Sequence, residues 1–191
     1  MKGIKIQLPI GERDISGLKA GDSVLLSGPL LSGRDAAHKR FITALKEGNP
    51  LPVDLSGETI YYVGPCPTPP GRVIGSAGPT TSGRMDSYTP ELLRLGLKGM
   101  IGKGQRSPEV IDAMKQYSAV YFAALGGAGA LIARSIKNAQ VIAYPDLGPE
   151  AVYRLDVVDF PAVVAIDAGG HDLYKLGRDE FARGCSWAVD L

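Results

Sequence analysis

Cysteine, histidine and tryptophan are scarce in this chain, and neither sign of charge dominates. Its 191 residues include two cysteines, two histidines and one tryptophan. Two cysteines are too few for a disulfide framework or a four-cysteine metal site. Two histidines are too few for a zinc site with an open coordination position. We therefore expect no metal site built by this chain alone.

The balance of charges argues against two classes of partner. The chain carries 21 Lys and Arg against 20 Asp and Glu, whereas proteins that bind nucleic acid or membrane surfaces usually have a basic excess. The longest uncharged stretch, residues 116–133, contains three glycines and is predicted to form a strand, a turn and a helix. The start of the chain lacks the apolar centre of a signal peptide. We expect a cytoplasmic protein with no membrane segment.

Apolar runs alternate with glycine- and proline-rich turns along the chain. The predicted strands cover residues 23–27, 59–63, 72–76, 99–101, 119–124, 141–144, 152–158 and 162–166, with 172–174 as a further candidate. The predicted helices cover residues 35–47, 89–96, 107–117 and 128–136. Helices between apolar strands favour a single α/β domain over residues 1–191, with a mixed sheet flanked by helices. The strand-rich ends could add a second, smaller sheet.

Three loops combine glycine with a cation just before a predicted helix. They are residues 32–35 with Arg34, residues 78–86 with Arg84, and residues 102–107 with Lys103. Ligands of open α/β sheets bind beyond the carboxyl ends of strands, where helix N-termini attract anions. Such cations are often merely solvated, but the shared arrangement favours a pocket for a small dianion, because arginine can bind a carboxylate in bidentate fashion.

Nucleotide binding is poorly supported. A phosphate-binding P-loop requires a pattern that Gly102-Lys103-Gly104 does not complete. The dinucleotide fingerprint would need a third glycine where Ser107 or Ile132 stands.

The remaining chemically reactive residues admit structural interpretations. His38 lies one helical turn beyond the arginine of the first loop and could share its face, although a structural histidine is favoured. Cys66 sits in a stiff proline-rich loop and Cys185 in the C-terminal tail, and both are read as structural or incidental. Asp146 and Glu150 flank a Gly-Pro pair and are predicted to shape a turn.

The loop motifs resemble one known family. The matching stretches are GPTTSGRMDSY at residues 78–88, SGRDAAH at 32–38, KGQRS at 103–107, YPDLGPEA at 144–151 and VDFPA at 158–162. Together they resemble the β subunit of class I, iron–sulfur-dependent fumarases, which corresponds to the C-terminal domain of the single-chain members. The β subunit of L(+)-tartrate dehydratase is a close relative.

The resemblance implies a hydro-lyase that interconverts (S)-malate and fumarate on a swivelling β/β/α-type domain. Family members use a [4Fe–4S] cluster held by three cysteines of the α subunit, whose open iron acts as a Lewis acid on the substrate. The two cysteines of this chain do not match those ligands. The resemblance therefore implies an α-subunit partner, with two copies of each chain, and an isolated chain that is inactive.

The resemblance also assigns roles to particular residues. The substrate-contact positions are Arg34, Thr80, Arg84 and Lys103. Thr80 corresponds to the proposed catalytic base, which needs neighbouring cations to lower its pKa because a threonine hydroxyl is a poor base. The candidates for supporting positions are His38, Thr81 and Asp86.

Two other functions remain open at this point. One is the β subunit of L(+)-tartrate dehydratase, which would convert tartrate to oxaloacetate. The other is a stand-alone module that binds dicarboxylates or other anions and needs no partner.

Overall fold

A seven-stranded sheet forms the centre of the structure, a computed structural model that describes residues 3–184. Its strands are β1 (Ile4–Gln7), β2 (Ser23–Ser32), β3 (Thr59–Tyr61), β4 (Gly99–Gly102), β5 (Val120–Ala123), β6 (Ile136–Ala143) and β7 (Val152–Ile166). Strands β1 to β5 pair in parallel. Strand β7 runs antiparallel to β2, β5 and β6. Because β7 reaches both β5 and β2, strands β2, β3, β4, β5 and β7 close into a barrel.

Alternation along the strands divides the core in two, since successive side chains of a strand point to opposite faces. One cluster fills the barrel and includes Tyr61, Ile101 and Phe122. Their neighbours in the chain belong to a second cluster under the helices, which includes Ile60, Met100 and Tyr121. Both faces are buried, so these strands are continuously apolar, as parallel strands covered by helices usually are.

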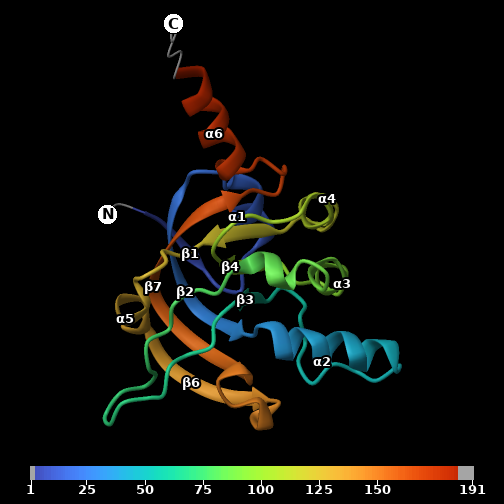
Figure 1. The fold of residues 1–191 in the computed structure, drawn as a ribbon, viewed down its shortest axis with the longest axis vertical. Helices are drawn as coiled ribbons and strands as arrows, with labels where there is room; N and C mark the ends of the chain where they lie inside the picture. The colour runs from blue at the N-terminus through green and yellow to red at the C-terminus, as the bar shows by residue number, and fades with distance from the viewer. Residues whose placement is uncertain (1–2, 185–191) are drawn as a thin grey trace, which may run out of the picture.

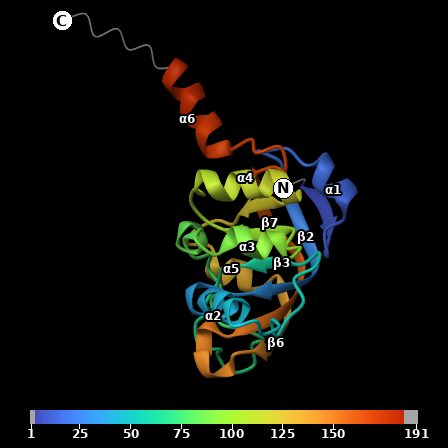
Figure 2. The same cartoon turned by 90° about the vertical axis from the view of Figure 1, so that its right-hand side faces the viewer.

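Three helices lie side by side over one face of the sheet, as Figure 1 and Figure 2 show. They are α2 (Asp35–Lys46), α3 (Thr89–Arg94) and α4 (Pro108–Tyr117). Their apolar side chains, among them Phe41, Leu92 and Met114, complete the second core cluster. Each helix begins shortly after one of the three glycine-and-cation loops. The carboxyl ends of β2 and β4 therefore lead into the starts of α2 and α4.

The other helices lie apart from this layer. Helix α5 (Gly129–Ala133) lies on the opposite side of the sheet from α2, α3 and α4 (Figure 1). Helix α1 (Glu12–Gly17) follows β1, and α6 (Leu173–Gly184) extends away from the sheet. Two short 3-10 turns complete the set, η1 (Ser82–Met85) and η2 (Pro145–Glu150).

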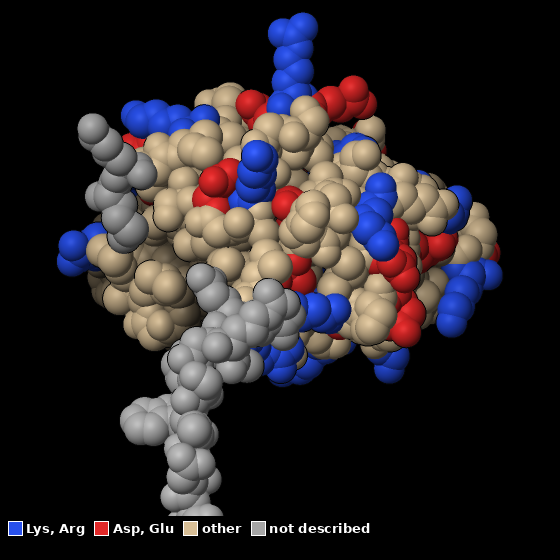
Figure 3. Space-filling view, turned by 90° about the horizontal axis from the view of Figure 1, so that it is seen from above, with Lys and Arg blue, Asp and Glu red and all other residues tan. Residues whose placement is uncertain are grey.

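The surface carries charges of both signs. On the face seen in Figure 3, basic and acidic side chains lie interspersed rather than in a large patch of one sign. Among the described residues, no helix is long and apolar enough to cross a membrane.

The predicted mixed sheet flanked by helices is confirmed, with corrections at several elements. Residues 72–76 are not a strand: a Cβ at Gly75 would overlap the carbonyl of Cys66, and the Cys66 N–H donates to the Ser76 carbonyl at 2.9 Å. This contact folds the segment back on itself, and Val73 is exposed. The segment is a packed loop.

Two predicted strands form one. Residues 152–158 and 162–166 are both part of β7, which continues through Pro161 because that residue pairs opposite Leu25 of β2 at a position where the ladder tolerates a proline. The helix predicted at 128–136 ends at Ala133, and Ile136 already begins β6. At 172–174 a single bridge at Asp172 is followed directly by α6.

The chain ends also differ from expectation. Strand β1 and helices α1 and α6 were not predicted. Strands β1 and β6 join the central sheet at its two ends, so the strand-rich termini build no second sheet within residues 3–184. The Ser107-Pro108-Glu109 pattern predicts a helix cap at Ser107, which is confirmed, because its hydroxyl accepts from the Val110 N–H. The Thr89-Pro90-Glu91 pattern predicts a cap at Thr89, and this prediction is wrong: Thr89 is the first residue of α3, and its hydroxyl donates to the Met85 carbonyl.

Candidate active site

The three cation-bearing loops meet at one edge of the sheet. Arg34 follows β2 closely and Lys103 follows β4 directly, as predicted. The loop with Thr80 follows no strand, but it is tied into the sheet from both sides. The Thr80 N–H donates to the Tyr62 carbonyl at 2.7 Å, just past β3, and the Lys103 N–H donates to the Thr80 carbonyl at 3.3 Å. Thr81 and Lys103 form an isolated parallel bridge. Thr80 and Lys103 are therefore neighbours.

Gly102 allows the second and third loops to touch. A Cβ at this position would overlap Ser82 Oγ and would lie 2.9 Å from a ring carbon of Tyr62. Ser82 is buried there, and its hydroxyl lies 2.9 Å from the Tyr121 hydroxyl, which donates to the Gly104 carbonyl at 2.9 Å. These contacts fix the backbone on both sides of Lys103.

A buried ion pair joins the same two loops. Arg106 Nε donates to Asp86 Oδ1 at 2.7 Å, and the side chain of Arg106 is fully buried. Asp86 Oδ2 accepts the Ser107 N–H at 2.7 Å, and Arg106 Nη2 donates to Thr89 Oγ1 at 2.8 Å. Asp86 was a candidate for a supporting position, and its contacts connect the loop of Thr80 and Arg84 to the loop of Lys103.

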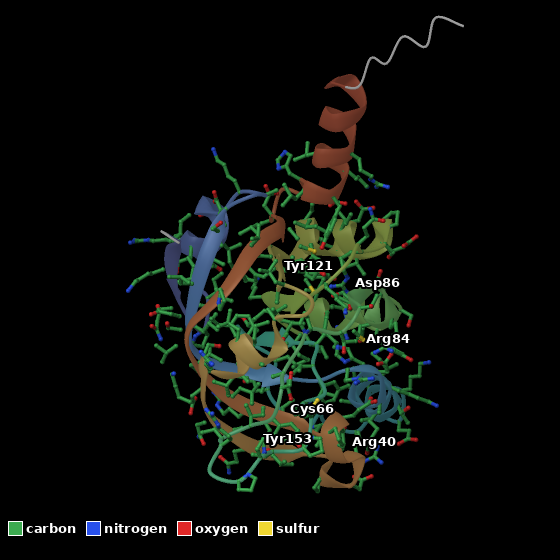
Figure 4. The ribbon with its side chains drawn as sticks, turned by 60° about the vertical axis from the view of Figure 1, so that its left-hand side comes forward. Arg40, Cys66, Arg84, Asp86, Tyr121 and Tyr153 are labelled. Carbon is green, nitrogen blue, oxygen red and sulfur yellow. The ribbon has the colours of Figure 1, made fainter. Side chains whose placement is uncertain are left out.

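Two aromatic rings hold the guanidinium of Arg106. Its central carbon lies 5.4 Å from the ring centroid of Tyr62 and 5.2 Å from that of Tyr121. A buried cation stacked on aromatic faces is stabilised by their quadrupoles. Figure 4 shows Tyr121, Asp86 and Arg84 toward the same side of the sheet.

One carboxylate brings the two site arginines together. Asp35 Oδ2 lies 2.9 Å from Arg84 Nη2 and 3.5 Å from Arg34 Nε. Arg34 Nη2 lies 3.3 Å from Glu150 Oε1, and Glu150 Oε2 accepts the Ala36 N–H at 3.0 Å at the start of α2. The guanidinium of Arg34 is thus bracketed by two acids, one of which also caps a helix.

Gly64 brings Arg34 close to the segment that carries Thr80. A Cβ at Gly64 would lie 2.7 Å from Arg34 Nη1, so a larger residue here would push the guanidinium out of this position. Gly64 stands two residues after Tyr62, whose carbonyl holds the Thr80 N–H. Arg34 and Arg84 are thus joined through Asp35, Thr80 and Lys103 through their backbones, and Gly64 brings the two pairs to the same edge of the sheet.

His38 stabilises the backbone of Arg34 at this edge of the sheet. Its Nδ1 lies 2.9 Å from the Arg34 carbonyl, and its ring meets the Tyr62 ring edge-on at 5.4 Å between centroids. Burial lowers the pKa of His38 to about 4, so the ring is neutral near pH 7 and Nδ1–H donates. His38 fixes the backbone of Arg34, as a structural histidine does.

The edge is open to its surroundings. The Arg84 side chain is 47% exposed and that of Asp35 is 38% exposed. Lys103 and Thr81 are exposed, and Thr80 is half-buried. A site of this shape can be covered by a second protein surface.

The described residues do not form the ligand set of an iron–sulfur cluster. Within residues 3–184, no group of three or more His, Cys, Asp or Glu side chains comes together in a way that could hold a metal ion. Cys66 is exposed and lies in the loop before the folded-back segment. Cys185 lies outside the described residues. A cluster held by three cysteines does not fit the part of the chain that is described.

Sequence reasoning missed three side chains of this network. Glu150 was interpreted as a turn residue, but it pairs with Arg34. No role was predicted for Asp35 or Arg106, although both stand within the stretches that resemble the fumarase family. The position of Asp35 next to Arg34 was a local signal, whereas the burial of Arg106 depends on distant strands.

The sequence of the chain is similar to those of known proteins. The family described as Fumarase C-terminus matches residues 1–177. The chain belongs to this family. Among curated members similar to this fumarase C-terminal chain, "Fumarate hydratase 2" of Leishmania major is 39% identical over 176 residues, covering 90% of the chain and 31% of the relative. "Fumarate hydratase class I, aerobic" of Escherichia coli (strain K12) is 41% identical over 152 residues, covering 78% and 28%.

A relative of similar length carries a different name. A protein of Methanocaldococcus jannaschii named for an L(+)-tartrate dehydratase β subunit is 39% identical over 170 residues, covering 86% of the chain and 87% of the relative. The chain thus spans less than a third of these two fumarate hydratases and matches most of the tartrate dehydratase subunit. Both kinds of name describe the addition or removal of water, so the family is one of hydro-lyases.

Proposed function

We propose that this chain supplies the carboxylate-binding half of a hydro-lyase active site that dehydrates (S)-malate to fumarate. The observation that carries the proposal is the convergence of Arg34, Thr80, Arg84 and Lys103 at one edge of the sheet. The arginines share Asp35, and the Lys103 N–H donates to the Thr80 carbonyl. A substrate with two carboxylates suits a site with three cations on rigid loops.

The cations bind and orient the substrate. Arg34 and Arg84 each offer a planar fork that matches a carboxylate in bidentate fashion, and Lys103 adds a compact positive charge. Holding both carboxylates fixes the carbon chain between them, which places the reacting carbon next to Thr80.

Thr80 removes the proton. Its deprotonated oxygen takes the proton from the carbon next to the hydroxyl-bearing carbon, and the electrons of that C–H bond form the double bond. The hydroxyl leaves as hydroxide with the electrons of the C–O bond, and a Lewis acid held by the partner would accept it. A threonine hydroxyl can act this way only where nearby cations stabilise its deprotonated form. We propose that Arg84, four residues on, and Lys103, whose backbone N–H donates to the Thr80 carbonyl, supply this stabilisation.

The rest of the site belongs to a partner. The family resemblance assigns a [4Fe–4S] cluster to an α subunit, and residues 3–184 of this chain contain no group of side chains that could hold it. The openness of the site edge supports a covering partner, as does the name of the M. jannaschii relative, a β subunit. We propose a complex with two copies of each chain, in which this chain alone is inactive.

Thr80→Ala tests the assignment of the base. In the complex reconstituted without oxygen, this variant should lose at least a thousandfold in kcat for malate dehydration while its unfolding midpoint stays near that of the wild type. Thr43→Ala is the matched control, because Thr43 is exposed on α2 away from the site edge. A Thr80→Ala complex with normal kcat contradicts the assignment.

Tartrate is the second candidate substrate. The near full-length match to a protein named for a tartrate dehydratase subunit favours it. Malate and L(+)-tartrate differ by one hydroxyl, so both fit the same pair of carboxylate anchors. Comparing kcat/KM for the two substrates on one reconstituted complex decides between them.

A further inference from the structure

Asp35 occupies an unusual position for an acid, since it lies among the cations of a site for anions. Its Oδ2 lies 2.9 Å from Arg84 Nη2 and 3.5 Å from Arg34 Nε. A carboxylate there takes up binding capacity that a substrate carboxylate needs. It also lowers the positive potential that attracts a dianion.

The contacts of Asp35 are ion pairs without good hydrogen-bond geometry. Asp35 Oδ2 and Arg34 Nε are both buried from solvent, and neither has a hydrogen-bond partner among the described residues. A carboxylate that binds an arginine fork with two aligned hydrogen bonds is held more strongly than one in such a contact. A substrate carboxylate that aligns two hydrogen bonds with Arg84 would therefore bind it more strongly than Asp35 does.

Glu150, the second acid beside Arg34, is built differently. Its Oε1 lies 3.3 Å from Arg34 Nη2, while its Oε2 accepts the Ala36 N–H at 3.0 Å. That second contact satisfies a free N–H at the start of α2, where a negative charge is favourable. Glu150 is thus committed to the helix, whereas the Oδ2 of Asp35 faces only the two arginines.

We propose that Asp35 is an internal competitor for the substrate carboxylate, which holds Arg84 beside Arg34 and releases it when a dicarboxylate binds. This inference rests on the proposed function of the site. Asp35 then sets how tightly the site binds dianions: it keeps the arginines aligned, and it weakens binding enough for the product, also a dianion, to leave. Asp35 is a positioning residue and does no chemistry.

Asp35→Asn separates these roles, because it removes the charge and keeps the shape. The reconstituted complex is titrated calorimetrically with succinate, a dicarboxylate with no hydroxyl to lose. The affinity of Asp35→Asn for succinate should rise three- to tenfold, a modest gain because the pair is partly exposed and screened. The KM for malate should fall in parallel, while kcat stays equal or drops as product release slows.

Two further variants make the result decisive. Asp35→Glu keeps the charge and should stay within twofold of the wild type. Asp112→Asn removes an acid on the exposed face of α4, where Asp112 pairs only with Lys115 among the described residues, and should change nothing. If Asp35→Asn fails to fold, Asp35→Ser is used. Failure of both variants to fold would make Asp35 a structural acid and overturn the proposal.

The outcomes distinguish this inference from the function on which it rests. Unchanged or weaker succinate binding by Asp35→Asn overturns the role of Asp35, even if the wild-type complex dehydrates malate normally. A wild-type complex that dehydrates neither malate nor tartrate contradicts the proposed function. The succinate titration still decides the role of Asp35 in that case, because it requires no turnover. If neither the wild-type complex nor the Asp35→Asn complex binds succinate, the proposed role of Asp35 is also wrong.

Discussion

Replacing Asp86 with alanine should destabilise the protein more than most single substitutions. The change removes the hydrogen bond from Arg106 Nε at 2.7 Å and that from the Ser107 N–H at 2.7 Å. It leaves the guanidinium of Arg106, whose side chain is fully buried, without its carboxylate. Breaking a buried pair by removing one partner costs about 3–5 kcal/mol, because an uncompensated charge remains in the interior.

Urea unfolding followed by circular dichroism measures this cost. The Asp86 carboxylate is 14% exposed, so water can replace part of what is lost, and we expect about 3 kcal/mol, the lower end of that range. Asp112→Ala is the matched control. It breaks an exposed pair with Lys115, which should cost less than about 0.5 kcal/mol.

The structural reasoning fails if Asp86→Ala costs less than about 1 kcal/mol. That result would mean that Arg106 finds water or another partner, and that the ion pair does not hold the loops of Thr80 and Lys103 together. If Asp86→Ala lowers the free energy of unfolding by about 3 kcal/mol but leaves substrate affinity unchanged, the ion pair stabilises the fold without shaping the site. That result would contradict a positioning role for Asp86.

The remaining predictions concern Arg84 and His38. Arg84→Lys should lower kcat/KM of the reconstituted complex at least tenfold, because an ammonium cannot make the bidentate contact. Arg94→Lys, at an exposed position of α3, should not lower it, and equal losses would reject the role of Arg84. The pKa of His38 is about 4 in the folded chain and about 6.5 when unfolded. The unfolded chain therefore binds more protons between these values, and stability should fall by up to about 3 kcal/mol as pH drops from about 6.5 to about 4. His38→Asn should lose that part of the pH dependence in urea titrations, and an unchanged slope would show that His38 titrates normally.

The cation loops could be predicted because their signals are local. Glycine, a cation and a helix start follow one another within a few residues around Arg34 and Lys103, and both loops lie at the carboxyl ends of strands as the pattern required. The loop before Thr80 did not fit the pattern, since residues 72–76 form no strand. Its position depends on hydrogen bonds to Tyr62 and Lys103, which are distant in the sequence.

The features that the sequence did not predict depend on packing between distant parts of the chain. No role was predicted for Arg106, because its burial requires Tyr62, just past β3, and Tyr121 of β5, which are distant in the sequence. Two separate strands were predicted on either side of Pro161, but the ladder with β2 carries one strand through it. The role of Thr80 as base came from the family resemblance alone, and neither composition nor spacing indicated it.

Malate dehydration measured without oxygen on this chain, on its iron–sulfur partner and on the two combined tests the central claim most directly. The account predicts no turnover by either chain alone, turnover by the mixture, and weak or no dicarboxylate binding by this chain in isolation. Tight dicarboxylate binding by the isolated chain, together with a mixture that acts on neither malate nor tartrate, would contradict it and would indicate a stand-alone anion-binding module.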